Sequence, residues 1–259
     1  MAFLQIYFQG LGLIIVFMTL LWLVSVLKKN ASIVDPFWGL GFVLLAWYYN
    51  FQSEGLEERK LIITVLITLW GLRLSIFLGI RNWNKPEDFR YQQFRKDFGE
   101  HRYWWVSFFQ VFLLQGILLW LISAPILGAQ NGANQGLGIL DYAAILLWII
   151  GFIFEAGGDY QLNKFKANPN NKGKVLDSGL WKYSRHPNYF GDGLQWVAFA
   201  ILSIANACYL PLLSALLMNY LLLKISGVSL LEKTLSKTKP QYAEYVNKTS
   251  AYLPWFPKK

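Results

Sequence analysis

The sequence predicts an all-α integral membrane protein with about seven transmembrane helices, an outside N-terminus and a cytoplasmic C-terminus. Of its 259 residues, 55% are hydrophobic and only 15% are charged, whereas about a quarter of the residues of a soluble domain are charged. Aromatic residues make up 17%, and such residues gather at membrane interfaces. No stretch alternates like a barrel strand, and a helix satisfies its own backbone groups in lipid.

The spans themselves are apolar stretches of ~20 residues, the length that crosses a bilayer. The clear stretches are 3–27, 61–80, 104–127 and 139–159, a weaker one is 36–51, and 189–225 has room for two spans with a break near 206–211. The first stretch lacks a basic leader and a small-residue cleavage site, so we interpret it as a retained helix and not as a signal peptide. We expect one polytopic membrane domain over residues 1–259.

Basic residues occur in alternate connections between these spans. They fill the connections after the first, third and fifth spans and the C-terminal tail, at Lys28, Lys29, Arg81, Lys85, Arg90, Arg95, Lys96, Arg102, Lys164, Lys166, Lys172, Lys174, Lys182, Arg185, Lys233, Lys237, Lys239, Lys248, Lys258 and Lys259. Because cytoplasmic connections retain Lys and Arg, this alternation predicts the orientation. It also explains the net charge of +9 without nucleic acid, for which no motif is visible.

Charged residues inside spans are costly and therefore indicate function. Arg73 lies within the third span, and Glu155 and Asp159 lie near the cytoplasmic end of the fifth. The i, i+4 spacing puts both carboxylates on one helical face, where they need a cation or hydrogen-bond donors opposite them. An ion pair between helices and a ligand site with hydroxyl or amide groups both remain open.

Two further features have an ordinary structural explanation beside a functional one. Asp35 stands before Pro36 at the start of the weaker span, the usual arrangement of a helix N-cap. The connection "RNWNKPEDFRYQQFRKDFGEHRYWW" suits an amphipathic helix at the membrane interface. Its four arginines would equally suit a lid over a phosphate-bearing ligand.

The stretch "GLWKYSRHPNYFGD", residues 179–192, is the most unusual polar segment. Arg185 suits a phosphate, His186 can donate a hydrogen bond, and Asn188 offers an amide donor and acceptor. No histidine cluster supports a metal site, and no glycine-rich phosphate-binding motif is present. We interpret the segment as a ligand-binding loop at the cytoplasmic interface.

This segment also carries a resemblance to a known family. Together with the preceding "ExxxDxQLxxFK" pattern (Glu155 to Lys166) and the following "SGVSLLEK…YAEYVNKTSAYLPW", it resembles the steroid 5α-reductase C-terminal domain family, in particular its bacterial branch. The Arg-His-Pro-x-Tyr signature is shared with membrane sterol C=C reductases and isoprenylcysteine carboxyl methyltransferases. The resemblance runs from about Asp35 to Pro254 and is strongest after Glu155.

The resemblance implies an NADPH-dependent reductase of the bacterial inner membrane that reduces a conjugated C=C of a steroid-like or isoprenoid enone, with its active site facing the cytoplasm. It places the cofactor-binding half at about 139–259 and the catalytic acid at Asp35. It places a phenol near Trp70, which has none. The cofactor residues it implies are Arg73, Arg81, Glu155, Asp159, Lys166, Tyr183, Arg185, His186, Asn188, Asp192, Glu232 and Tyr245.

Two other classes of function remain open. One is an S-adenosylmethionine-dependent membrane lipid or prenylcysteine methyltransferase, and the other is a membrane protein without catalytic activity. Asp192 and the Glu155/Asp159 pair resemble the reductases more than the methyltransferases. The basic connections also suit a cofactor with three phosphates better than a sulfonium.

Overall fold

The computed structural model describes residues 2–132, 136–225, 227–239 and 241–258, and this described part holds helices and connections without a β-strand. The all-α prediction is therefore confirmed for these residues. The chain forms two compact units. Unit 1 comprises Met1–Leu137 and Ser203–Tyr209, and unit 2 comprises Gly138–Leu202 and Leu210–Lys259.

Among the described residues, five helical stretches are long and apolar enough to cross a membrane. They are Phe3–Lys28, Ala31–Gln52, Glu57–Asn82, Glu100–Gln130 and Ile139–Ala167. Each contains one of the stretches predicted from hydropathy, including the weaker stretch at 36–51. The total of seven spans and their orientation stay predictions.

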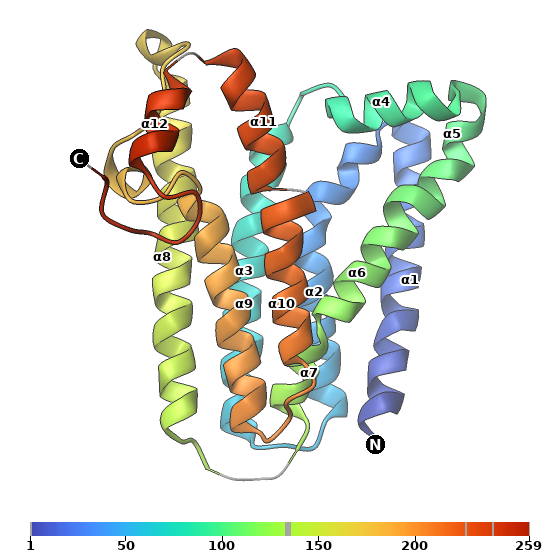
Figure 1. The fold of residues 1–259 in the computed structure, drawn as a ribbon. Helices are drawn as coiled ribbons and strands as arrows, with labels where there is room; N and C mark the ends of the chain where they lie inside the picture. Colours follow the sequence, from blue (N-terminus) through green and yellow to red (C-terminus); the bar gives the residue numbers. More distant parts are fainter. Residues whose placement is uncertain (1, 133–135, 226, 240, 259) are drawn as a thin grey trace. The chain divides into compact units, whose positions relative to one another are not determined.

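Unit 1 consists of long antiparallel helices and a shorter, broken helical run (Figure 1). Its elements are α1 (Phe3–Lys28), η1 (Ala31–Ile33), α2 (Val34–Gln52), α3 (Glu57–Asn82), α4 (Phe89–Phe98), α5 (Glu100–Ser107), the π-helical turn η2 (Phe108–Leu113), α6 (Leu114–Ile122) and α7 (Ala124–Gln130).

Helices α2 and α3 pack closely because glycines face each other at their crossing. A Cβ on Gly39 would lie 2.5 Å from the carbonyl oxygen of Gly71, and one on Gly71 would lie 2.7 Å from that of Gly39. Small residues let membrane helices approach closely, where van der Waals contact holds them together. The contact fixes the start of α2, which carries Asp35, relative to the end of α3 that is predicted to face the cytoplasm.

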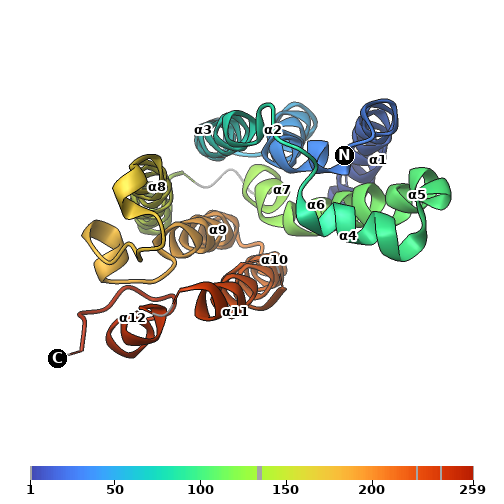
Figure 2. The same ribbon diagram turned by 90° about the horizontal axis from the view of Figure 1, so that it is seen from above.

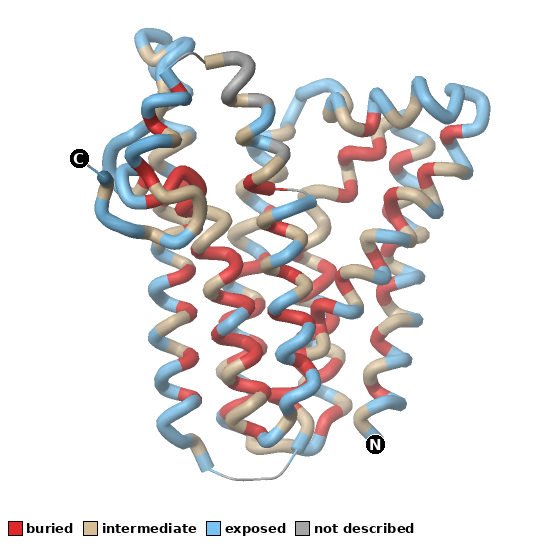
Figure 3. The backbone as a smooth tube through the Cα atoms, in the orientation of Figure 1, coloured by how far each residue is buried: buried red, intermediate tan, exposed pale blue. Residues whose placement is uncertain are grey.

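The connection between the third and fourth predicted spans contains α4. Asp88 caps this helix, since its carboxylate accepts a hydrogen bond of 3.0 Å from the backbone N–H of Arg90. Polar residues make α4 largely exposed, with Tyr91 as its buried residue. Figure 3 shows most of α4 as exposed or intermediate. The cap therefore sets which residue of the connection points inward.

Unit 2 is built on two long helices and a C-terminal helical segment (Figure 1). Its elements are α8 (Ile139–Ala167), η3 (Pro169–Asn171), η4 (Gly179–Lys182), α9 (Pro187–Ala205), α10 (Leu212–Tyr220), the π-helical turn η5 (Leu221–Ile225), α11 (Val228–Thr238) and α12 (Tyr242–Lys248). The break predicted near residues 206–211 lies between α9 and α10, and the last residues of α9 belong to unit 1.

Helices α8 and α9 lie side by side in both ribbon views (Figures 1 and 2). Glycines again form the contact, because a Cβ on Gly191 would lie 2.3 Å from the carbonyl oxygen of Gly151 and 2.4 Å from the backbone nitrogen of Glu155. This close approach brings the carboxylates of α8 within hydrogen-bonding reach of α9. Helix packing thus positions the polar residues described next.

Candidate functional site

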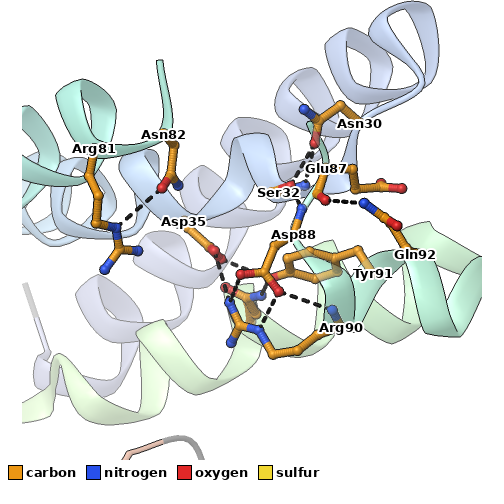
Figure 4. Close-up of polar contacts among 11 residues, drawn as sticks. Asn30, Ser32, Asp35, Arg81, Asn82, Glu87, Asp88, Arg90, Tyr91 and Gln92 are labelled. Carbon is orange, nitrogen blue, oxygen red and sulfur yellow. Dashed lines mark hydrogen bonds and ion pairs between the residues drawn. The ribbon is translucent and has the colours of Figure 1, made fainter. Parts of the chain in front are cut away.

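Asp35 lies in the first turn of α2 and binds two side chains of the α4 segment (Figure 4). Its Oδ1 accepts a hydrogen bond of 2.7 Å from the Tyr91 hydroxyl, and its Oδ2 accepts one of 3.1 Å from the Arg90 guanidinium. The residue at the N-cap of α2 is Ile33, and no side chain caps that position. The capping explanation for Asp35 is therefore wrong, because its carboxylate is engaged by α4.

Tyr91 was not among the site residues predicted from the sequence. It is 4% exposed, and its hydroxyl donates to Asp35 and accepts a hydrogen bond of 3.2 Å from Nε2 of Gln115 in α6. Burial, followed by the negative charge of Asp35, raises the pKa of Tyr91, so this phenol stays protonated. The available signal was a tyrosine between Arg90 and Gln92, which places an aromatic hydroxyl within the polar connection.

A polar frame holds this pair in place (Figure 4). The carboxylate of Asp88 accepts from Nε of Arg90 at 2.9 Å, and its backbone N–H donates to Oγ of Ser32 at 2.8 Å. Glu87 accepts from the backbone N–H of Ala31 at 2.7 Å and forms an ion pair of 2.9 Å with Arg95. The start of α2 and the start of α4 are thus joined at several points around Asp35.

The other predicted residues of unit 1 lie along α3. The guanidinium carbons of Arg73 and Arg81 are 5.2 and 6.0 Å from the ring centre of Phe77, one helical turn away on either side. Arg73 is half-buried and Arg81 is exposed. Trp70, to which the family pattern assigns a phenol, is fully buried, with its ring 5.5 Å from that of Phe42. In this chain the phenol next to Asp35 belongs to Tyr91.

In unit 2, the 179–192 stretch forms a turn that leads into α9. Pro187 is the first residue of α9, where a missing backbone N–H costs nothing. The indole of Trp181 donates to the carbonyl of Gly158 in α8 at 3.1 Å, and Ser184 Oγ donates to the carbonyl of Tyr252 at 2.8 Å. The stretch is therefore fixed on one side by α8 and on the other by the C-terminal segment.

Arg185 and His186 meet Glu232 of α11. Nε and Nη2 of Arg185 lie 2.8 and 2.7 Å from Oε1 of Glu232, and Nε2 of His186 lies 3.3 Å from the same oxygen. Nη1 of Arg185 donates to the carbonyls of Val246 and Thr249 at the end of α12. Hydrogen bonding to His186 and then to Arg185 lowers the pKa of Glu232, although partial burial opposes this.

Amide groups of α9 face the two acidic residues of α8. Nε2 of Gln195 donates to Oε2 of Glu155 at 2.7 Å, and Nδ2 of Asn188 donates to Oδ1 of Asp159 at 2.9 Å. The sequence predicted donors opposite this pair of carboxylates, but Gln195 was not among its candidates. Gln195 stands seven residues after Asn188 in a helix, two turns along the same face, and this spacing was the available signal.

A cavity of 140 Å³ lies beside the Arg185–Glu232 pair. Its wall combines cationic, aromatic and aliphatic side chains, and its polar members are Lys166, Trp181, Arg185, His186, Asn188, Tyr189, Lys239, Tyr242 and Tyr245. Burial raises the pKa of Tyr242 to about 12, so its hydroxyl is neutral at physiological pH. The structure therefore brings together Lys166, Arg185, His186, Asn188 and Tyr245, with Glu232 beside them.

The remaining predicted residues have other neighbours in unit 2. The ring of Tyr183 packs edge-on against Phe256, with ring centres 6.0 Å apart. Asp192 is buried in α9, and burial followed by the charge of Asp192 raises the pKa of the Tyr252 hydroxyl. Within the described ranges, no group of three or more His, Cys, Asp or Glu residues could hold a metal ion.

The donor set around the cavity fits part of a nicotinamide dinucleotide. Oδ1 of Asn188 is buried and has no hydrogen-bond partner among the described residues, so it can accept from a carboxamide or a ribose hydroxyl. Lys166 and Lys239 add positive charge to the cavity wall, and ammonium groups are common ligands of phosphate in proteins. The volume is smaller than the ~300–1,000 Å³ of whole-ligand pockets, so the cavity suits one ring or phosphate group of such a cofactor.

Comparisons with known proteins connect the chain to a protein family and to a reductase. Over 277 residues of alignment it is 27% identical to "Uncharacterized protein C594.04c" of Schizosaccharomyces pombe, covering 95% of this chain and 78% of that protein. Over 79 residues it is 35% identical to "Delta(14)-sterol reductase erg24" of the same organism, covering 25% of this chain and 19% of the reductase. No solved structure matches.

The family match and the partial reductase match together suggest a membrane reductase-like family. The matched family is described as "Protein of unknown function (DUF1295)", and the match extends over residues 21–249. The matched range includes both the Asp35–Tyr91 pair and the Arg185–Glu232 pair. This chain belongs to the DUF1295 family.

Proposed function

We propose that the protein is an NADPH-dependent membrane reductase that reduces the conjugated C=C of a hydrophobic enone, steroid-like or isoprenoid. The observation that carries the proposal is the 2.7 Å hydrogen bond between the Tyr91 hydroxyl and the Asp35 carboxylate. In ketosteroid isomerase, a tyrosine phenol and a protonated aspartic acid donate to the oxyanion of an enolised ketone. In this proposal the Tyr91 phenol has the donor role, and the Asp35 carboxylate holds it. The partial match to a sterol reductase supports the same reaction class.

The residues of unit 1 have distinct roles in this proposal. When a hydride adds to the β-carbon of an enone, the electron pair of the C=C moves toward the carbonyl oxygen. Tyr91 turns its O–H from Asp35 to that oxygen and stabilises the negative charge. Asp35 keeps its hydrogen bond to Arg90, so its carboxylate remains compensated when the phenol turns away. The α-carbon then takes a proton from water, and the hydride and this proton together complete the two-electron reduction.

The residues of unit 2 bind and orient the cofactor in this proposal. NADPH supplies the hydride when bound. Lys166 and Lys239 hold phosphate, Oδ1 of Asn188 accepts from the carboxamide or a ribose, and Tyr189 provides an aromatic face. Arg185 and Glu232 keep α11 and α12 against the 179–192 stretch. The predicted orientation places this unit's polar end at the cytoplasm, where NADPH is available.

A binding test separates this proposal from its main alternative. The purified protein in detergent should gain thermal stability with micromolar NADPH and should not gain it with S-adenosylmethionine, and it should oxidise NADPH when given a hydrophobic cyclic enone. Stabilisation by S-adenosylmethionine alone would indicate a methyltransferase and contradict the proposed reductase function. Indifference to both cofactors would favour a protein without this catalytic activity.

A further inference from the structure

Unit 1 contains a second cavity that the proposed reaction does not use. It has a volume of 880 Å³ and lies between the first turns of α2 and the last turns of α3. On α3 its wall runs from Leu72 to Asn82, which is about 15 Å of helix at the usual rise per residue. The volume is in the range of ~300–1,000 Å³ that small-molecule pockets occupy.

The two ends of this groove differ in character. Its inner part is apolar and is lined by Phe37 and Leu40 of α2 and by Leu72 and Ile76 of α3. Its mouth is polar and lies where α1 ends, α2 begins and α3 ends. The polar residues of the mouth are Lys28, Asn30, Ser32, Asn82, Asn84, Lys85 and Asp88, four of which appear in Figure 4. An amphiphile with a polar head and apolar tails matches this gradient.

The mouth carries an excess of positive charge. Lys28 and Lys85 are exposed, and neither forms an ion pair within the part of the chain that the structure describes. The one carboxylate of the wall, that of Asp88, is compensated by the 2.9 Å ion pair to Arg90. Two uncompensated ammonium groups at the predicted cytoplasmic interface attract an anionic head group.

A polar group and an open space inside the groove point to an occupant. Ser75 is 9% exposed and lines the cavity, and its hydroxyl has no hydrogen-bond partner among the described residues. A buried hydroxyl is normally satisfied, so this one is available to an ester carbonyl. A Cβ on Gly79 would meet nothing within 4 Å, which leaves the wall between Ser75 and the mouth open.

We propose that this groove binds an anionic phospholipid. Its phosphate lies between Lys28 and Lys85, an ester carbonyl accepts from Ser75, and its acyl chains follow the apolar faces of α2 and α3. Asp35 and Tyr91 do not line the groove, although its wall shares Ser32 and Asp88 with the polar frame around them. Lipid binding there does not require the reductase activity. Binding joins the ends of three helices, and the lipid therefore stabilises unit 1.

Native mass spectrometry of the full-length protein tests this site with two lipids of identical acyl chains, phosphatidylglycerol and phosphatidylcholine. We expect wild-type protein to retain phosphatidylglycerol with roughly tenfold higher affinity, since each lysine near a charged surface contributes a factor of several. The double variant Lys28→Gln/Lys85→Gln should lose this preference. The control Lys164→Gln/Lys172→Gln, which removes the same charge from exposed positions of unit 2, should keep it.

Two further measurements identify the chemical source of the bound phosphate and the position of the lipid's acyl chains. Glycerol 3-phosphate should not displace phosphatidylglycerol, whereas displacement would mean a site for a free phosphate ester and overturn the proposal. Gly79→Trp fills the groove and should weaken both lipids. Equal retention of the two lipids by wild-type protein, or equal losses in the groove and control variants, would also overturn it. The lysine variants lie at the surface, so this test does not depend on whether Gly79→Trp folds.

Discussion

The guanidinium of Arg185 forms a 2.7 Å ion pair with Glu232, 47 residues further along the chain. Its third nitrogen donates to the carbonyls of Val246 and Thr249, so all three nitrogens are engaged by protein groups. Arg185 is 7% exposed. This arrangement makes Arg185 the residue that holds α11 and α12 against the start of α9.

Arg185→Ala should therefore destabilise the protein and weaken both nicotinamide cofactors by the same factor. Loss of hydrogen bonds from a charged group costs roughly 1.5–3 kcal/mol. Thermal unfolding in detergent measures the stability, and titrations with NADPH and NADH measure the binding. A loss confined to NADPH would instead place Arg185 on the 2′-phosphate, in agreement with the phosphate-binding role that the sequence predicted for it.

Tyr91→Phe should lower kcat for enone reduction by about 10²–10³-fold, the usual effect of removing one oxyanion donor. The ring remains, so the packing of α4 is retained, and only the hydroxyl that bonds Asp35 is lost. Gln115→Leu provides the comparison, because it removes the other hydrogen bond of the same hydroxyl and leaves the donor in place. Steady-state rates with a cyclic enone measure both variants. Undiminished turnover by Tyr91→Phe would mean that Tyr91 only holds α4 in place and does not act on the substrate.

Acid should loosen the Glu232 contact. His186 and Arg185 lower the pKa of Glu232 below its ordinary value of 4.5, so the folded state favours the carboxylate. The resulting stability is fully present above pH 4.5 and is lost as the pH falls through the lower folded pKa. The unfolding temperature should drop in that window. Glu232→Gln should lower it at neutral pH and flatten the acid dependence, and a variant with unchanged dependence would assign the effect to another group.

Gly191→Ala should separate α9 from α8. The added Cβ would lie 2.3 Å from the carbonyl oxygen of Gly151, which is backbone and cannot yield by a side-chain rotation. We expect a loss of ~1–3 kcal/mol in the free energy of unfolding, as for other overpacked contacts. Gly12→Ala is the control, because its Cβ would meet nothing within 4 Å and alanine favours the helix. Similar unfolding temperatures for the two variants would argue against the α8–α9 contact.

Local sequence patterns predicted the helices well, for a physical reason. Hydropathy over about 20 residues reflects whether a segment can leave water, and this property does not depend on tertiary contacts. The stretches at 3–27 and 139–159 lie inside α1 and α8, and even the weak stretch at 36–51 lies inside α2. The polar character of 179–192 was equally visible, because a proline-broken run with charged and amide side chains differs clearly from the apolar stretches on either side.

Partners of individual side chains were harder to predict. Asp35 looked like a helix cap because Pro36 follows it. Only the position of α4 shows that the hydroxyl of Tyr91, 56 residues away, donates a hydrogen bond to its carboxylate. Glu155 and Asp159 were expected to face donors, but the spacing along one helix could not say that these are the amides of Gln195 and Asn188.

The amino-acid sequence alone was enough to predict a helical chain that is apolar over membrane-length stretches and rich in cations at alternate connections. Only the packing of the helices shows which polar groups meet: Tyr91 with Asp35, and Arg185 with Glu232. Hydropathy and charge are sums over neighbouring residues, so they can be followed along the chain. A hydrogen bond requires two atoms within about 3 Å, and that distance depends on the glycine contacts that set how adjacent helices pack.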